Sequence, residues 1–230
     1  MLIREKLSKS DKACILASKE RGWILEPDAK AMLERHGFDL PGRLVTDSLS
    51  DANAFLSELS APVVVKAVSP RILHKTEYNA VAVGVKTDKE LEREMTRLLA
   101  LEGCQSVLVE EMVQGVEIFA GAENDDEFGP VVILGIGGTA VEVYNDTAIR
   151  MAPVTPDDVE SMVNSLKAST LFTGFRGGNG VNMVALTEMV VRFSHLSMAL
   201  EQDFQSVDLN PVICGPEKCM VADARIMLAP

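Results

Sequence analysis

The sequence predicts an α+β fold in two parts, and three observations predict it. Short β-type runs alternate with amphipathic helical segments along most of the chain. Between residues 107 and 152 the predicted strands follow one another without a helix, which favours antiparallel pairing over a doubly wound parallel sheet. The character of the chain changes near residues 105–110, so we expect two domains, 1–109 and 110–230.

The first half of the chain supplies helices and short strands in alternation. We expect helices over 1–20, over 27–37 (where Pro27 begins the helix and Gly37 ends it), over 51–59 and over 88–101. The last of these is strongly amphipathic, with Leu91, Met95 and Leu98 on one face. Strands are expected over 43–46, 63–68 and 81–85, because these runs are rich in valine and similar residues.

The second half is richer in strands. We expect strands over 107–112, 116–122, 131–134, 141–144 and 149–152, then a helix over 156–165 that begins after Thr155. A glycine-rich loop (173–182) precedes a long helix over 184–202. The final strands, 207–212 and 220–226, flank a turn at Gly215-Pro216.

Composition narrows the function classes. The 230 residues include 34 acidic and 22 basic side chains, a net charge of -12, which argues against nucleic acid and against anionic membrane surfaces as partners. No apolar run approaches the roughly 18 residues of a membrane span, and the N-terminus lacks the apolar core of a signal peptide. We therefore expect a cytoplasmic protein.

The four cysteines are scattered. Cys214 and Cys219 are five residues apart and do not form a CxxC motif, and the three histidines lie far from them. We expect reduced thiols rather than a metal–thiolate site.

The segment VVVKAVSPRILHKT (63–76) is the most informative. Lys66 interrupts a buried strand with a charge, which costs free energy unless an anion or carboxylate meets it. Ser69-Pro70 ends the strand, and His74 follows on the connection. A lysine on a strand and a histidine just after it suggest phosphate chemistry. The alternative is a lysine that extends to solvent and a surface histidine.

Glycines follow the strand at 131–134. Residues 135–140 match G-x-G-x-x-A, the dinucleotide fingerprint, but that fingerprint needs a helix to begin there. The following residues instead favour a strand. A glycine turn that lets backbone amides approach a ligand, or a tight strand connection, fits better.

Carboxylates lie at the end of the strand over 107–112. Glu110 and Glu111 close this strand, and Glu117 lies on the next. They could form a solvated rim. Backbone groups at such a strand end could also bind an adenine edge, with a nearby carboxylate at the ribose.

Oxygen-bearing side chains gather near the C-terminus. Asp208 and Asn210 share one face of a strand, because side chains alternate, and Asp223 is expected on the next strand. Such oxygens suit Mg²⁺; alternatively they cap a turn beside Pro211. Arg176, in the loop GFRG, could clamp a phosphate or carboxylate, or simply lie in a surface loop.

Taken together, these segments resemble the ATP-grasp β subunit of ADP-forming acetyl-CoA (acyl-CoA) synthetases, relatives of succinyl-CoA synthetase. The similar motifs follow the family's order along nearly the whole chain: VVVKAVSPRILHKT, VLVEEMVQGVEIFAGA, EFGPVVILGIGGTAVEVYND, IRMAPV, GFRG, VDLNPV and VADARI. The resemblance implies two α+β subdomains with the nucleotide bound between them. Residues 1–109 would form the N-terminal helix and the first subdomain, and 110–230 the second.

The resemblance also implies roles for individual residues toward ATP or ADP and Mg²⁺. Lys66 would contact phosphates, and Glu117 would lie near the ribose. The hinge around adenine would comprise Glu110, Met112 and Val113. Arg176 is a further candidate for nucleotide binding.

For metal and catalysis, the resemblance implies Asn210 and Asp223 as Mg²⁺ ligands, with Asp208 close by as a candidate catalytic residue. His74 matches the histidine that carries the phosphoryl group. The implied reaction interconverts acyl-CoA, ADP and phosphate with acid, CoA and ATP. A partner α subunit would supply CoA-binding and phosphohistidine domains. The alternatives are a non-catalytic nucleotide-binding module of an acyltransferase-type assembly and another ATP-grasp carboxylate ligase.

The chain departs from the family pattern at three asparagines. Asn79-Ala80 stands where Gly-Gly is usual, Asn124 where a basic residue is common, and Asn182 where an acidic residue is expected.

Overall fold

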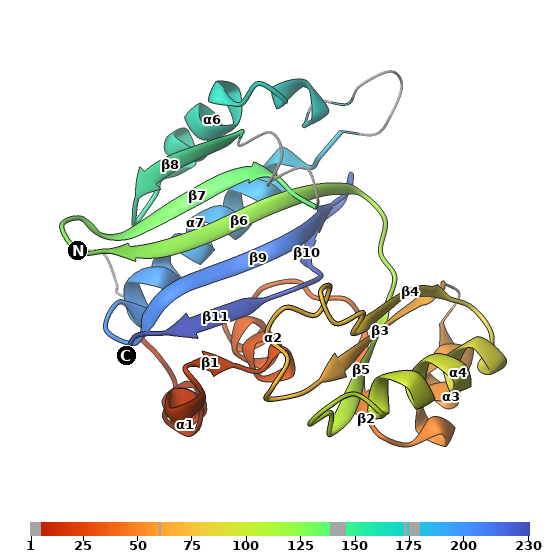
Figure 1. Cartoon of the computed structure of the whole chain (residues 1–230). Helices are drawn as coiled ribbons and strands as arrows, with labels where there is room; N and C mark the ends of the chain where they lie inside the picture. The colour runs from red at the N-terminus through yellow and green to blue at the C-terminus, as the bar shows by residue number, and fades with distance from the viewer. Residues whose placement is uncertain (1–5, 60, 139–145, 173, 175–179) are drawn as a thin grey trace. The chain divides into compact units, whose positions relative to one another are not determined.

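The chain forms two compact units in the computed structural model, which describes residues 6–59, 61–138, 146–172, 174 and 180–230 (Figure 1). Unit 1 comprises Met1–Leu40 and Gln114–Pro230, and unit 2 comprises Pro41–Val113. Each unit has its own cluster of buried apolar side chains. The two are therefore described separately.

Unit 2 is a four-stranded antiparallel sheet with two helices. Its strand order is β2-β5-β3-β4, and the strands are β2 (Arg43–Thr46), β3 (Val63–Val68), β4 (Val81–Val85) and β5 (Ser106–Glu111). The helices are α3 (Leu49–Glu58) and α4 (Asp88–Leu99). Thr87 and Glu90 form a capping box at the start of α4, and its predicted apolar face is buried. The predicted ranges of β2, β3 and β4 are confirmed.

Unit 1 is built on a seven-stranded antiparallel sheet of order β1-β11-β9-β6-β7-β8, with β10 paired to β9. The strands are β1 (Trp23–Ile24), β6 (Val116–Asp125), β7 (Gly129–Ile136), β8 (Thr147–Met151), β9 (Phe204–Cys214), β10 (Cys219–Val221) and β11 (Arg225–Leu228). The predicted antiparallel pairing of consecutive strands is confirmed for β6, β7 and β8. The predicted strand over 141–144 lies outside the described residues.

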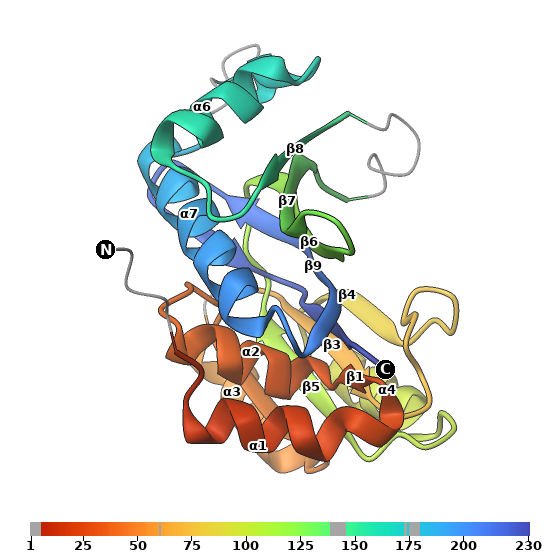
Figure 2. The same ribbon diagram turned by 90° about the vertical axis from the view of Figure 1, so that its left-hand side faces the viewer.

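The helices of unit 1 are α1 (Lys9–Ser18), α2 (Glu26–Arg35), α6 (Pro156–Ser165) and α7 (Met183–Leu200), with 3₁₀ turns η1 (Lys19–Arg21) and η2 (Ser169–Leu171). Helices α6 and α7 lie against one face of the sheet (Figure 2). Within the described ranges, α7 is the one helix long and apolar enough to span a membrane by length and composition. Its Leu186, Val190 and Phe193 are fully buried in the core of unit 1, which is typical of a core helix.

The predicted division of the chain at 109/110 needs correction. One boundary falls close to it, at 113/114, but residues 1–40 belong with the C-terminal unit. The physical reason is β1, a two-residue strand that pairs Trp23 with Met227 and Ile24 with Ile226 on β11. So short a strand has no periodicity to detect. The strand β5, which we grouped with the later strands, pairs with β2 and β3 in unit 2.

The cysteine prediction is also wrong for one pair. Cys214 on β9 and Cys219 on β10 face each other in the antiparallel register and form a disulfide, whereas Cys14 and Cys104 are free. The five-residue spacing is unlike CxxC, but a hairpin turn between the two strands places these residues opposite each other.

Candidate functional site

Lys66 and Glu110 form a buried ion pair in unit 2. The Lys66 ammonium lies 2.9 Å from a Glu110 carboxylate oxygen, and the two side chains are only 8% and 3% exposed. The strand register explains the contact: Glu110 lies opposite Val64, two residues before Lys66, so the pair is diagonal on one face of the sheet. The alternatives of a lysine extending to solvent and of Glu110 in a solvated rim are therefore wrong. The expected anionic partner of Lys66 is confirmed, and it is Glu110.

His74 lies on the connection between β3 and β4, as predicted, and it is exposed. The connection is anchored on both sides of it, because Ile72 and Ala80 are buried. The Ala80 amide donates to the Lys75 carbonyl at 2.8 Å, which closes a turn. A well-anchored loop therefore presents His74 to the outside of unit 2.

Met112 and Val113 lie where the chain passes from unit 2 to unit 1. The Met112 amide donates to the Pro62 carbonyl at 2.9 Å, and Val113 is the last residue of unit 2. The two residues thus connect the units, and their role toward adenine stays a prediction.

In unit 1, Asn210 and Glu117 meet at the glycine segment after β7. The Asn210 amide oxygen accepts the Gly138 N–H at 3.0 Å, and the Glu117 carbonyl accepts the Gly137 N–H at 2.7 Å. Gly138 has a positive φ of 68°, and a Cβ there would lie 2.0 Å from the Glu117 carboxylate. The two glycine amides thus donate to groups of the protein itself, and the predicted approach of backbone amides to a ligand stays a prediction.

Asp223 joins Asn210 through the neighbouring proline. It lies in the connection between β10 and β11, not on a strand as we expected. The Pro211 carbonyl accepts the N–H groups of Ala222 and Asp223, at 3.0 and 3.3 Å. These bonds fix Asp223 beside the residue that follows Asn210, so the structure brings the two predicted metal ligands into one region.

Asp208 is engaged by an arginine. The residues Asp208 and Arg225 are directly opposite in the β9–β11 register, and the guanidinium donates to one carboxylate oxygen at 2.6 and 3.1 Å. Asp208 and Asn210 alternate with buried Val207 and Leu209 along β9, so they share a face, as predicted, and do not cap a turn.

The residues present fit Mg²⁺. An amide oxygen from Asn210 and a carboxylate from Asp223 are hard oxygen donors, and Mg²⁺ takes one or two of these and completes its shell with water and phosphates. Among the residues that the structure describes, no group of three or more histidine, cysteine or acidic side chains could hold a metal ion. An all-protein metal cage is thus not found there. The remaining candidate, Arg176, lies outside the described residues.

Two buried residues near Asp223 escaped the sequence analysis. Lys30 and Glu26, four residues apart on α2, form an ion pair of 2.9 Å with side chains 0% and 3% exposed. The Lys30 ammonium also donates to the Ala222 carbonyl at 2.6 Å. The (i, i+4) spacing of Glu26 and Lys30 indicates an ion pair on a helix. It does not indicate a buried one, because such pairs usually lie on a solvated helix face.

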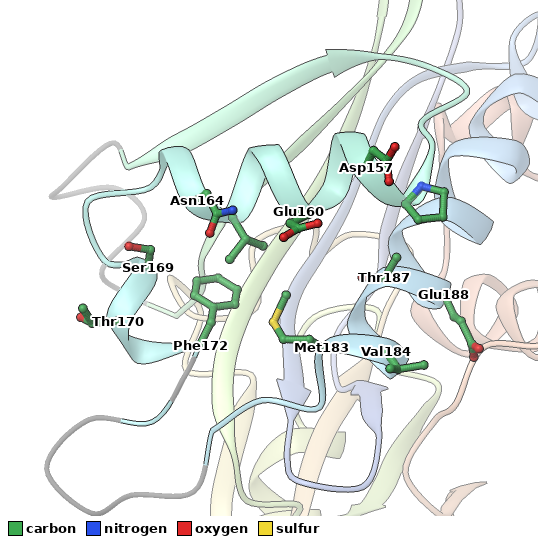
Figure 3. Close-up of a pocket in the computed structure, with 12 residues that line it drawn as sticks. Asp157, Glu160, Asn164, Ser169, Thr170, Phe172, Met183, Val184, Thr187 and Glu188 are labelled. Atoms are coloured by element: carbon green, nitrogen blue, oxygen red, sulfur yellow. The ribbon is translucent and has the colours of Figure 1, made fainter.

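A separate groove of about 740 Å³ lies among α6, η2 and the start of α7 (Figure 3). Phe172 and Met183 are among the residues that line it. The lining residues, all in the described part of the chain, include three carboxylates and no lysine or arginine: Asp157, Glu160 and Glu188. This charge would repel a triphosphate, so we do not place a nucleotide there.

The two antiparallel units are those of an α+β protein with groups suited to phosphate on one sheet and to Mg²⁺ on the other. A model of the ATP-grasp domain family matches residues 15–228. The chain therefore belongs to the ATP-grasp family.

Its relatives include the β subunit of acetate–CoA ligase [ADP-forming] I from Pyrococcus furiosus, which is 31% identical over 97% of this chain and 100% of that subunit. Among solved structures, the dinucleotide-forming acetyl-coenzyme A synthetase 1 of Ca. Korarchaeum cryptofilum, in complex with coenzyme A, Ca-AMPCP and HgCl⁺, has a TM-score of 0.86 and 33% identity, covering 95% of this chain and 99% of that chain. The same enzyme with coenzyme A and Mg-AMPPCP has a TM-score of 0.81, with the same identity and coverage, and its phosphohistidine segment points towards the nucleotide-binding site.

Proposed function

We propose that this chain is the nucleotide-binding β subunit of an ADP-forming acyl-CoA synthetase, an acid–thiol ligase. The single observation that supports this most strongly is the similarity to a β subunit over its whole length. The enzyme would interconvert acyl-CoA, ADP and phosphate with acid, CoA and ATP.

His74 would carry the phosphoryl group. In the direction of ATP consumption, a nitrogen of the neutral imidazole attacks the terminal phosphorus; a P–N bond forms and the bond to the ADP oxygen breaks. An exposed position on an anchored loop suits a group that must meet both a nucleotide and a second site. The presence of His74 favours this function over a purely regulatory module.

Lys66 and the two oxygen donors would bind the nucleotide phosphates and their metal. Lys66 would donate to phosphate oxygens, since an ammonium carries three N–H groups and can bond to more than one acceptor. Asn210 and Asp223 would hold Mg²⁺, which offsets negative charge on the phosphates when bound. The solved relatives with Mg-AMPPCP and Ca-AMPCP support such a cofactor.

We further propose a partner α subunit with CoA-binding and phosphohistidine domains. The relative from Pyrococcus furiosus is named as a β subunit, which supports a partner subunit. The acyl group would then be selected largely outside this chain.

Reconstitution tests the proposal. The chain is mixed with an α subunit of this enzyme class, acetate, CoA and Mg·ATP, and thioester, ADP and phosphate are measured, with each protein alone as a control. We expect one ADP and one phosphate per thioester, and little thioester from this chain alone.

Two other results would contradict the proposal. Acyl-phosphate formation by the chain alone would support an ATP-grasp carboxylate ligase instead. Tight Mg·ATP binding without turnover, with an α subunit that is active with its own β subunit, would support a regulatory module.

A further inference from the structure

The buried pair of Glu26 and Lys30 is unusual because removing two charges from water carries a large desolvation penalty. Both lie on α2, within a face whose Ala29, Met32 and Leu33 are fully buried. An apolar residue of similar size at position 30 would pack there without that cost. A charged group at position 30 therefore suggests that the Lys30 ammonium makes a further bond that an apolar side chain could not make.

The ammonium holds the turn that presents Asp223. The Lys30 ammonium donates to the carbonyl of Ala222, the residue directly before Asp223, at 2.6 Å. A hydrogen bond from a charged donor is shorter and stronger than one between neutral groups. Residue 30 is thus tied to the backbone one residue away from a metal-ligand candidate.

Further hydrogen bonds restrain this turn, and one of them is donated by the Ala224 amide to the Asp223 carboxylate at 3.1 Å. The Val221 amide donates to the Asp39 carbonyl at 2.9 Å, and the amides of Ala222 and Asp223 donate to the Pro211 carbonyl. Val221 and Ala224, on either side, are 0% and 3% exposed. The Lys30 bond adds a restraint on the Ala222 carbonyl, and so on the peptide unit that leads into Asp223.

We propose that Lys30, itself held by Glu26, is a positioning residue for the Mg²⁺ ligand Asp223. The inference rests on the proposed function of the chain as a Mg·nucleotide-binding subunit. Lys30 touches neither metal nor nucleotide in this proposal. It orients the peptide that precedes Asp223, and loss of such an outer partner typically weakens metal affinity about 10- to 100-fold.

The test measures metal dependence rather than turnover. ATP affinity is titrated in the full chain without metal and at increasing Mn²⁺, and bound Mn²⁺ is followed by its electron paramagnetic resonance signal. In Lys30→Met we expect the Mn²⁺ concentration for half-maximal enhancement of ATP binding to rise about 10- to 100-fold. ATP affinity without metal should stay within about twofold of that of the unaltered chain, because Lys66 is untouched.

Three further variants make the result specific. Lys30→Arg keeps the charge and should recover much of the Mn²⁺ response. Lys12→Met removes an exposed lysine of α1 and should leave both the Mn²⁺ requirement and the ATP affinity unchanged. Since Lys30→Met leaves the Glu26 carboxylate without its 2.9 Å ammonium partner and could unfold, the double variant Glu26→Gln/Lys30→Met removes both charges at nearly constant volume. It should fold and show the same raised Mn²⁺ requirement.

The outcomes separate the two proposals. An unchanged Mn²⁺ requirement in the folded double variant, with a normal response in the unaltered chain, overturns the positioning role alone. No metal-dependent ATP binding by the unaltered chain overturns the proposed function, and the positioning role with it.

Discussion

At the residue scale, Lys66 has a structural role and a proposed binding role, and a single substitution would affect both at once. It is the ammonium partner of a buried carboxylate, and it is the proposed phosphate ligand. Removing one member of a buried ion pair costs about 3 kcal/mol or more, whereas replacing both by neutral residues of similar size is often close to neutral.

We therefore predict different effects on stability and binding. Lys66→Met should lower the free energy of unfolding by about 3 kcal/mol, and Lys66→Met/Glu110→Gln should recover most of it. Both variants should bind ATP at least about tenfold more weakly, a loss of about 1.4 kcal/mol. Denaturant unfolding and calorimetry measure the two quantities. Normal ATP affinity in the double variant would remove Lys66 from the phosphate site.

The three asparagines that depart from the family pattern each have a local structural role. Asn79 has a positive φ of 49°, a conformation that asparagine tolerates better than most residues. The Asn124 amide donates to the Glu201 carbonyl at 2.7 Å, and the Asn182 side chain accepts the amides of Val184 and Ala185 at the start of α7. Each of the three asparagines thus has a structural role that does not involve the nucleotide.

Asp11 predicts how the free energy of unfolding depends on pH. Burial alone would raise the pKa of this carboxyl, but hydrogen bonds from the Ser8 amide, Arg35 and His36 together hold it below the ordinary 3.8. The stabilisation is therefore fully present above about pH 3.8 and is lost as the pH falls through the lower folded value. Asp11→Asn should cost about 1.5–3 kcal/mol near neutral pH, from lost charge-assisted hydrogen bonds.

Denaturant unfolding of both proteins between pH 2 and pH 7 measures this effect. The difference in the free energy of unfolding between Asp11→Asn and the unaltered chain should become smaller below about pH 3.8. A gap of constant size across that range would mean that the lowered pKa does not contribute to stability.

At the scale of elements, the close packing of the chain just after β7 against β6 depends on a glycine. A Cβ at Gly137 would lie 2.6 Å from the backbone of Ile118, whereas a Cβ at Gly215 would have nothing closer than 3.9 Å. We predict that Gly137→Ala lowers the free energy of unfolding by about 1–3 kcal/mol. The matched control Gly215→Ala should stay within about 0.5 kcal/mol. Equal stabilities of the two variants would show that the backbone around Gly137 and Ile118 shifts easily to admit a methyl group.

The β9–β10 hairpin gives a second test at this scale. Only Cys14 and Cys104 are free in the structure, since Cys214 and Cys219 are bonded. Thiol titration of the denatured, unreduced protein should therefore find two thiols per chain, and four after reduction. Four thiols before reduction would restore our first expectation of unpaired cysteines.

The cytoplasmic location stays a prediction.

At the scale of the whole molecule, local patterns predicted the elements better than their grouping. The valine-rich β3 and the capped helix α4 have strong local signals, and both were placed well. The assignment of residues 1–40 failed because it depends on β1 pairing with β11, about two hundred residues away in sequence. Pairing across such a separation is set by tertiary packing, which leaves no local pattern.

The same contrast holds for the candidate site. The residue types at Lys66, His74, Asn210 and Asp223 suggested phosphate and Mg²⁺ chemistry before any coordinates. The Lys66–Glu110 pair and the Asp208–Arg225 pair required strand register, and the bond from Lys30 to Ala222 required the packing of α2. Sequence thus indicated the chemistry, and tertiary structure supplied the partners.

Transfer of a phosphoryl group to His74 is the step on which the proposed function depends most. The chain is incubated with Mg²⁺ and ATP labelled in the terminal phosphate, with and without an α subunit, and the label is located by peptide mapping. We predict an acid-labile, base-stable label on His74 that His74→Ala abolishes while ATP binding persists. No label under either condition, or a label that persists in His74→Ala, would contradict the proposed function.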